Sequence, residues 1–241
     1  MNISKSDLKK FSSLKNKSKR YEYGYFVVEG LKNCVELVNS DIKIREIFIT
    51  NDYLLNEFPN AKVVTSKELK RISQLKTPSE VLAIANIPQR SKIDINSKVI
   101  LYLEDIKDPG NLGTIIRTLD WFGYTQLFCS EETVDNFNSK VIMASMGSIF
   151  RVNVIYLKFE NLLKYFSDYN IYGTYVNENN IHDKIIKQKS IIVMGNESKG
   201  ISDSLSTHIN NRVSIPKFGR AESLNVSTAT GIILNEINRN Y

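Results

Sequence analysis

Hydrophobic residues recur with two different periods from about residue 25 onward. Short runs rich in Val, Ile, Phe and Tyr predict strands, and apolar positions three and four apart between these runs predict amphipathic helices. The expected strands are residues 25–30, 46–50, 62–66, 81–87, 99–105, 126–130, 152–157, 171–176, 190–195 and 212–216, and the expected helices are residues 31–40, 51–58, 67–75, 111–123, 139–150, 159–169 and 223–240.

A polar stretch at residues 88–97, which opens with Pro88, interrupts this alternation. We expect a linker there. It divides the chain into residues 1–87, a small α/β unit, and residues 98–241, a larger α/β unit. Strand and helix alternate throughout the larger unit and need crossover connections, so a mostly parallel sheet covered on both faces is predicted. Such sheets bind their ligands at the carboxyl ends of the strands.

Composition is that of a globular protein, with 42% hydrophobic and 24% charged residues. No apolar run approaches the roughly 18 residues that a membrane span needs, and the start of the chain lacks the hydrophobic stretch of a secretory signal. We therefore expect a cytoplasmic protein. Cys34 and Cys129 are far apart and predict buried free thiols. His182 and His208 have no His or Cys near them in the sequence, so no structural metal is expected.

The net charge of +6 is concentrated at the start of the chain, where residues 1–20 hold seven basic side chains and one acidic side chain. Two interpretations stay open: a frayed, solvated terminus, or an arm that binds RNA phosphates. The aromatic residues at positions 21, 23, 25 and 26 would stack on bases or belong to the core. The arm would use Lys9, Lys10, Lys15, Lys17, Lys19 and Arg20.

Polar residues and glycines gather in three stretches that follow predicted strands, at residues 108–117, 194–202 and 215–229. Glycine lets the backbone turn tightly and present N–H groups to a ligand. Because the carboxyl ends of parallel strands share one edge, the three stretches predict one common pocket.

Each polar residue in these stretches also has an ordinary interpretation. Asn111 would be a helix N-cap, and Arg117 would be a surface arginine. Glu197 would be a solvated loop acid or would accept hydrogen bonds inside a pocket. Ser223 would be an N-cap. Asn225 lies in the first turn of the predicted helix, where an acidic residue would interact better with the helix dipole. An Asn at this position indicates that its neutral amide forms hydrogen bonds with a functional role.

Two common nucleotide-binding motifs are missing. Gly195 and Gly200 are spaced as in a Walker A loop, but Ile201 stands where that motif has its lysine, which argues against an ATPase. The GxGxxG fingerprint of dehydrogenases is absent as well.

Together, residues 111–117 (NLGTIIR), 195–201 (GNESKGI) and 215–232 (IPKFGRAESLNVSTATGI) resemble the signature of the SpoU-type (TrmH-like) RNA 2'-O-ribose methyltransferases of the SPOUT superfamily. The resemblance covers residues 100–238. The first unit, with its YFVVEG strand, is similar to the RNA-binding domain that many members carry. The resemblance implies a trefoil knot in the larger unit, a homodimer, and S-adenosylmethionine as the cofactor.

The resemblance also implies residue roles. Arg117 matches the catalytic arginine, which fixes an RNA phosphate and stabilises charge on the ribose oxygen. Asn111, Glu197, Ser223 and Asn225 match the residues that orient Arg117, the ribose and the cofactor. The cofactor would be bound by Thr174, Tyr175, Gly195, Asn196, Ile215, Leu224 and Asn225.

The chain departs from the family pattern at Ser198, where Gly is common, at Lys217, where Met is frequent, and at Met143, where many relatives are polar or basic. The expected function is S-adenosylmethionine-dependent methylation of a ribose 2'-hydroxyl in structured RNA, with ribosomal RNA preferred. The alternatives are a tRNA 2'-O-methyltransferase and a non-catalytic RNA-binding protein that retains the fold.

Overall fold

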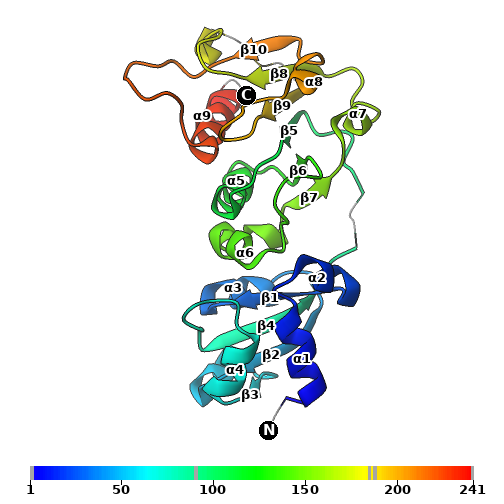
Figure 1. Cartoon of the computed structure of the whole chain (residues 1–241), viewed down its shortest axis with the longest axis vertical. Helices are drawn as coiled ribbons and strands as arrows, with labels where there is room; N and C mark the ends of the chain where they lie inside the picture. Colours follow the sequence, from blue (N-terminus) through cyan, green and yellow to red (C-terminus); the bar gives the residue numbers. More distant parts are fainter. Residues whose placement is uncertain (1–2, 90–91, 184–185, 187–188, 240–241) are drawn as a thin grey trace. The chain divides into compact units, whose positions relative to one another are not determined.

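The computed structural model describes residues 3–89, 92–183, 186 and 189–239. The chain groups into two compact units, and its helices and strands are labelled in Figure 1. The first unit combines residues 1–91 with residues 135–151, and the second combines residues 92–134 with residues 152–241. The division at residues 88–97 stays a prediction, and positions 90 and 91 of that stretch lie outside the described residues.

The first unit is built on a four-stranded sheet with the order β1-β4-β2-β3. β1 and β2 both pair antiparallel with β4, while β3 runs parallel to β2. Thr65 and Glu68 form a capping box, because the Thr65 hydroxyl accepts from the Glu68 N–H while the Glu68 carboxylate accepts from the Thr65 N–H. The elements are β1 (Tyr25–Glu29), α3 (Leu31–Val38), β2 (Ile44–Ile49), the 3-10 helix η1 (Asp52–Asn56), β3 (Lys62–Val63), α4 (Ser66–Ile72) and β4 (Val81–Asn86).

The basic start of the chain is folded into two helices that the sequence analysis missed, α1 (Lys5–Ser13) and α2 (Lys17–Tyr23). Leu8, Phe11 and Leu14 are spaced three residues apart and are buried in one core cluster with residues of the sheet. This burial holds the helices in place, so residues 5–23 are not the frayed, solvated segment of one of the two interpretations.

Residues 135–151 pack with the first unit through α6 (Ser139–Ser145) and the 3-10 helix η2 (Ser148–Phe150). The expected single helix is interrupted by Met146 and Gly147, whose φ angles are 51° and 95°. The Phe137 ring lies 4.6 Å from the Phe26 ring, centroid to centroid. Phe26 is therefore a fully buried core residue and not a platform for bases.

The second unit contains a six-stranded sheet with the order β10-β8-β9-β5-β6-β7, in which every pair of neighbours is parallel. This confirms the predicted mostly parallel sheet. All six carboxyl ends therefore lie along one edge. The strands are β5 (Val99–Leu103), β6 (Gln126–Cys129), β7 (Asn153–Tyr156), β8 (Asn170–Thr174), β9 (Ser190–Met194) and β10 (Asn211–Val213).

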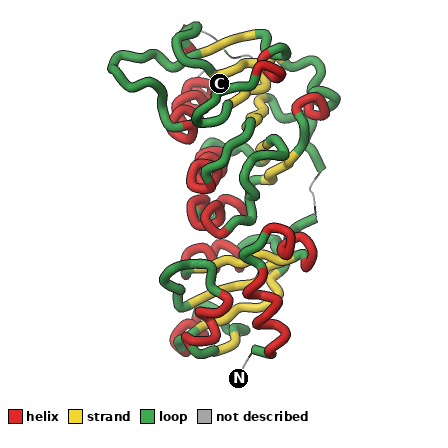
Figure 2. The backbone as a smooth tube through the Cα atoms, viewed as in Figure 1, coloured by secondary structure: helices red, strands yellow, loops and turns green. Residues whose placement is uncertain are grey.

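Helices of unequal length follow these strands along the chain. The two long ones, α5 (Pro109–Trp121) and α9 (Val226–Arg239), contact each other. The short ones are α7 (Phe159–Leu162), η3 (Ile181–Asp183) and α8 (Asp203–Ser206). A long loop joins β10 to α9 and projects from the unit in Figure 2. The trefoil knot stays a prediction.

Cys34 and Cys129 are buried and free, as predicted. Burial raises the pKa of the Cys34 thiol to about 12. The thiol is therefore neutral and unreactive at physiological pH. Within the described ranges, no helix is long and apolar enough to cross a membrane.

Candidate active site

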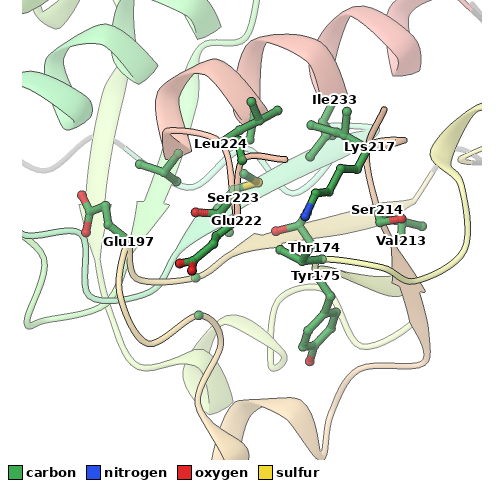
Figure 3. Close-up of a pocket in the computed structure, with 18 of the residues that line it drawn as sticks. Thr174, Tyr175, Glu197, Val213, Ser214, Lys217, Glu222, Ser223, Leu224 and Ile233 are labelled. Atoms are coloured by element: carbon green, nitrogen blue, oxygen red, sulfur yellow. The ribbon is translucent and has the colours of Figure 1, made fainter. Parts of the chain in front are cut away.

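The second and third polar stretches meet around one cavity at the carboxyl ends of β8, β9 and β10 (Figure 3). Its volume is about 580 Å³, which is the size of an ordinary small-molecule site. Loops after the three strands and the first turns of α9 form its walls. The predicted site residues that line it are Thr174, Tyr175, Gly195, Asn196, Glu197, Ile215, Ser223 and Leu224.

The wall after β9 depends on close approach of the backbone at Gly195. A Cβ on Gly195 would lie only 2.3 Å from the carbonyl carbon of Gly200 and 2.4 Å from the nitrogen of Ile201. Two backbone hydrogen bonds close the loop, from Asn196 N to Gly200 O at 3.0 Å and from Gly200 N to Asn196 O at 2.9 Å. Only glycine fits at position 195, and the loop is held narrow.

The side chain of Asn196 stabilises the same loop from within. Its Oδ1 accepts from the N–H groups of Ser198 at 2.9 Å and Lys199 at 3.1 Å. Its Nδ2 donates to the carbonyl of Asp105 at 2.7 Å. The amide is therefore engaged in shaping the wall, and a ligand would meet the backbone of this residue.

Asn111 is not the N-cap of α5. Asp108 holds that position, and its carboxylate accepts from the Asn111 N–H at 2.8 Å. The Asn111 side chain is thereby left for other partners: its Nδ2 donates to Glu197 Oε1 at 3.0 Å. Its Oδ1 accepts from Asn225 Nδ2 at 2.9 Å. The first stretch thus reaches the pocket through Glu197.

The expected N-cap role of Ser223 is also wrong. α9 begins at Val226, and Asn225 caps it by accepting from the Ser227 N–H at 2.9 Å and from the Ser227 hydroxyl at 2.6 Å. Ser223 lies in the loop before the helix, exposed on the pocket wall. Asn225 uses its oxygen for the cap and its N–H for Asn111, which fixes the orientation of the amide.

The remaining wall is largely apolar. Ile181, Val213 and Ile233 line it beside Ile215 and Leu224. Lys217, at the position where Met is frequent in the family, extends its ammonium group toward Thr174 in Figure 3. An apolar slot with backbone groups and a few charges at its edge suits a flat aromatic group attached to a polar chain.

Arg117 does not line the pocket of its own chain. It lies six residues after Asn111 on α5, which places the two side chains roughly 120° apart around the helix axis. Trp121, one turn further on the same face, is 85% exposed. In the part of the chain that the structure describes, Arg117 is exposed and has no hydrogen bond or ion pair.

The predicted RNA-binding residues are of three kinds: exposed lysines, lysines with a partner in the chain, and the buried Arg20. Lys9, Lys15 and Lys17 are exposed. Lys10 lies over the Tyr25 ring, 4.7 Å from its centroid, and Lys19 forms an ion pair with Glu22 at 2.6 Å.

Arg20 requires a correction. It is only 3% exposed, and its Nε donates to Asp135 Oδ2 at 3.1 Å while its Nη1 donates to the carbonyl of Leu14 at 2.9 Å. The hydroxyl of Tyr21 donates to the other oxygen of the same carboxylate at 2.7 Å. A buried, paired guanidinium cannot contact a phosphate, so Arg20 is a structural residue and not an RNA contact.

Across residues 3–89, 92–183, 186 and 189–239, no three His, Cys, Asp or Glu side chains come close enough to hold a metal ion. The fold and the site together define an α/β protein with a small-molecule pocket at the carboxyl edge of a parallel sheet and a separate, smaller unit. The model of the SpoU rRNA Methylase family matches residues 98–235, and that of the MRM3-like substrate binding domain matches residues 5–83. The chain belongs to the SpoU rRNA methylase family.

Similar proteins cover nearly the whole chain. The 23S rRNA (guanosine(2553)-2'-O)-methyltransferase RlmP of Bacillus subtilis (strain 168) is 27% identical over 94% of this chain and 94% of its own length. A structure assigned to the TrmH family of RNA methyltransferases, from Porphyromonas gingivalis, is 31% identical, with a TM-score of 0.87 over 99% of both chains. An rRNA methyltransferase from Sinorhizobium meliloti with bound AdoMet is 26% identical, with a TM-score of 0.84 over 98% of this chain and 95% of that one.

Proposed function

We propose that this protein transfers a methyl group from S-adenosylmethionine to a ribose 2'-hydroxyl in ribosomal RNA. The observation that carries the proposal is the Asn225–Asn111–Glu197 chain of hydrogen bonds, which joins all three family stretches at one pocket. Family membership supports the reaction, and the similarity to RlmP over nearly the full length supports ribosomal RNA as the substrate.

The residues around the cavity fit S-adenosylmethionine. The apolar slot beside Ile215 and Leu224 would accept the adenine, and the narrow loop at Gly195 would let backbone groups approach the ligand closely. Thr174 and Tyr175 line the other side of the cavity. When bound, the cofactor supplies a methyl group that its positively charged sulfur makes easy to transfer. No metal is needed for this chemistry, because the leaving group is already activated.

The protein's own task is to place the ribose oxygen in line and to favour loss of its proton. We assign to Asn111, Glu197, Ser223 and Asn225 the positioning of the ribose and of the loops that hold the cofactor. We propose that Arg117 binds the phosphate next to the target ribose. From there its guanidinium also stabilises the negative charge that develops on the attacking oxygen.

This assignment requires a second copy of the chain, because Arg117 lies outside its own pocket. We propose a homodimer in which Arg117 of one copy reaches the pocket of the other. The exposed Trp121 on the same face of α5 supports this arrangement, since tryptophan is enriched in protein–protein interfaces. We propose that the protein acts in the cytoplasm.

The proposal is tested with the Arg117→Ala variant. We expect S-adenosylmethionine to bind this variant as it binds the wild type in calorimetry, while methyl transfer to unmodified 23S ribosomal RNA falls at least about a hundredfold. Mixing Arg117→Ala with Gly195→Ala, which keeps the arginine but blocks the pocket, restores part of the activity through mixed dimers. A wild type that binds RNA but not S-adenosylmethionine would instead indicate a non-catalytic RNA-binding protein.

A further inference from the structure

Phe218 is 98% exposed, on the loop between β10 and α9, and it lines the pocket together with Lys217 and Gly219. Leaving a whole phenyl ring in water forgoes the free energy that its burial would provide. Single exposed apolar residues are common on protein surfaces, but this one stands at the rim of the proposed active site. Its place there indicates that a ligand covers it during the reaction.

The space around this loop is open. A Cβ on Gly219 would meet no atom within 4 Å, and residues 217–225 are all exposed. A flat group can therefore approach the Phe218 ring from solvent without displacing any part of the protein.

The charges at the rim favour an anionic ligand. Lys199, Lys217 and Arg220 are exposed, and none of their side-chain cations forms a hydrogen bond or ion pair with another described residue. Two acidic side chains, Glu197 and Glu222, lie on the pocket wall. Glu197 accepts a hydrogen bond from Asn111. An exposed aromatic ring beside unpaired cations is the combination with which proteins bind unpaired nucleotides.

We propose that Phe218 stacks on an unpaired base of the RNA beside the target ribose, and that Arg220 binds a phosphate of the same strand. This inference rests on the proposed function and adds an RNA contact within the methyltransferase unit. The reaction brings a ribose to this pocket, so its own base or that of the next nucleotide comes within reach of the rim. Phe218 thereby selects RNA whose target lies outside a regular helix, because a base stacked within a duplex cannot cover the ring.

The experiment compares Phe218→Ala, Phe218→Trp and the control Tyr165→Ala, which removes another exposed aromatic ring of the same unit. The probe is an unmodified 23S ribosomal RNA transcript, with S-adenosylmethionine affinity measured separately by calorimetry. We expect Phe218→Ala to weaken RNA binding roughly tenfold, while Phe218→Trp and Tyr165→Ala bind like the wild type. The control Tyr165→Ala keeps its S-adenosylmethionine affinity and its turnover at saturating RNA within about twofold of the wild type.

Salt dependence separates stacking from charge. The slope of log affinity against log salt stays unchanged in Phe218→Ala, whereas Arg220→Gln lowers it by about 0.7, the value for one phosphate of a single strand. The inference is overturned if Phe218→Ala binds RNA normally, if it loses S-adenosylmethionine affinity because the ring covers the cofactor, or if it dissociates into monomers. In each case wild-type methyl transfer, assayed in parallel, shows whether the proposed function itself stands.

Discussion

Asn225 donates a side-chain hydrogen bond to Asn111 at 2.9 Å, although 114 positions separate the two in sequence. Asn111 in turn donates a side-chain hydrogen bond to Glu197 at 3.0 Å. Each amide has a fixed orientation, because the oxygen of Asn225 is engaged at the α9 cap and that of Asn111 accepts from Asn225. Three segments from distant parts of the sequence are thereby aligned by two hydrogen bonds.

A carboxylate at position 111 should disturb this alignment. Asn111→Asp places a second negative charge about 3 Å from Glu197, and like charges at that distance oppose each other and raise one of the two pKa values. We expect S-adenosylmethionine affinity at neutral pH to fall about tenfold. The deficit shrinks as the pH is lowered, because one carboxyl group of the pair becomes protonated and donates the missing hydrogen bond.

The matched control is the double variant Asn111→Asp with Glu197→Gln. Its new amide donates to the new carboxylate, so cofactor affinity returns at neutral pH and loses its pH dependence. If the single variant binds S-adenosylmethionine normally at neutral pH, the hydrogen bond between the two side chains does not shape the pocket.

Gly195→Ala is expected to close the pocket. The added Cβ would lie 2.3 Å from backbone that cannot move without opening the Asn196–Gly200 loop. We expect a loss of about 1–3 kcal/mol in the free energy of unfolding and at least tenfold in cofactor affinity. Gly219→Ala is the control, since its Cβ meets nothing within 4 Å and its φ is not positive. Equal cofactor affinity in both variants would show that the cofactor binds elsewhere.

Arg20 and Asp135 stabilise the first unit as a buried ion pair. Arg20→Met leaves an unpaired carboxylate with little access to water, which costs about 3–5 kcal/mol in the free energy of unfolding. Urea denaturation measures this loss, and Lys15→Met, at an exposed site on the same segment, serves as the control with an effect within about 0.5 kcal/mol. If the Arg20→Met protein had normal stability but weakened RNA binding, Arg20 would be an RNA contact and not a structural residue.

The exposed lysines of the first unit remain the predicted phosphate contacts. We expect Lys9, Lys15 and Lys17, replaced together by Gln, to lower the slope of log RNA affinity against log salt by about 2. The thermal midpoint should not change, because all three side chains are exposed. The same replacement at Lys158, Lys164 and Lys189, exposed lysines of the second unit, serves as the comparison. Equal slopes in the two triple variants would mean that the basic helices do not bind the RNA.

Much of the architecture could be predicted because strands and helices have different periods of apolar residues. The parallel sheet and the gathering of residues 194–202 and 215–229 at one edge follow from that alternation alone. The sequence analysis did not predict the helices α1 and α2. The spacing of Leu8, Phe11 and Leu14 was a readable sign of an amphipathic helix.

Other features depend on competition between neighbouring residues or on the folded chain. Asp108 before Pro109 is itself a helix-start signal and outcompetes Asn111 for the cap. Nothing in the sequence distinguishes the buried Arg20 from the exposed lysines around it, because its partner Asp135 lies 115 positions away. The position of Arg117 outside its own pocket likewise depends on how α5 is turned against the sheet.

The most direct test of the account is the chemical position of the transferred methyl group. The wild-type protein is incubated with methyl-labelled S-adenosylmethionine and unmodified 23S ribosomal RNA, and the RNA is then hydrolysed in alkali. Alkali cleaves RNA through the free 2'-hydroxyl, so a 2'-O-methylated ribose survives within a dinucleotide. The account predicts label in alkali-resistant dinucleotides. Label released in mononucleotides, or none transferred by a protein that binds the cofactor, would contradict it.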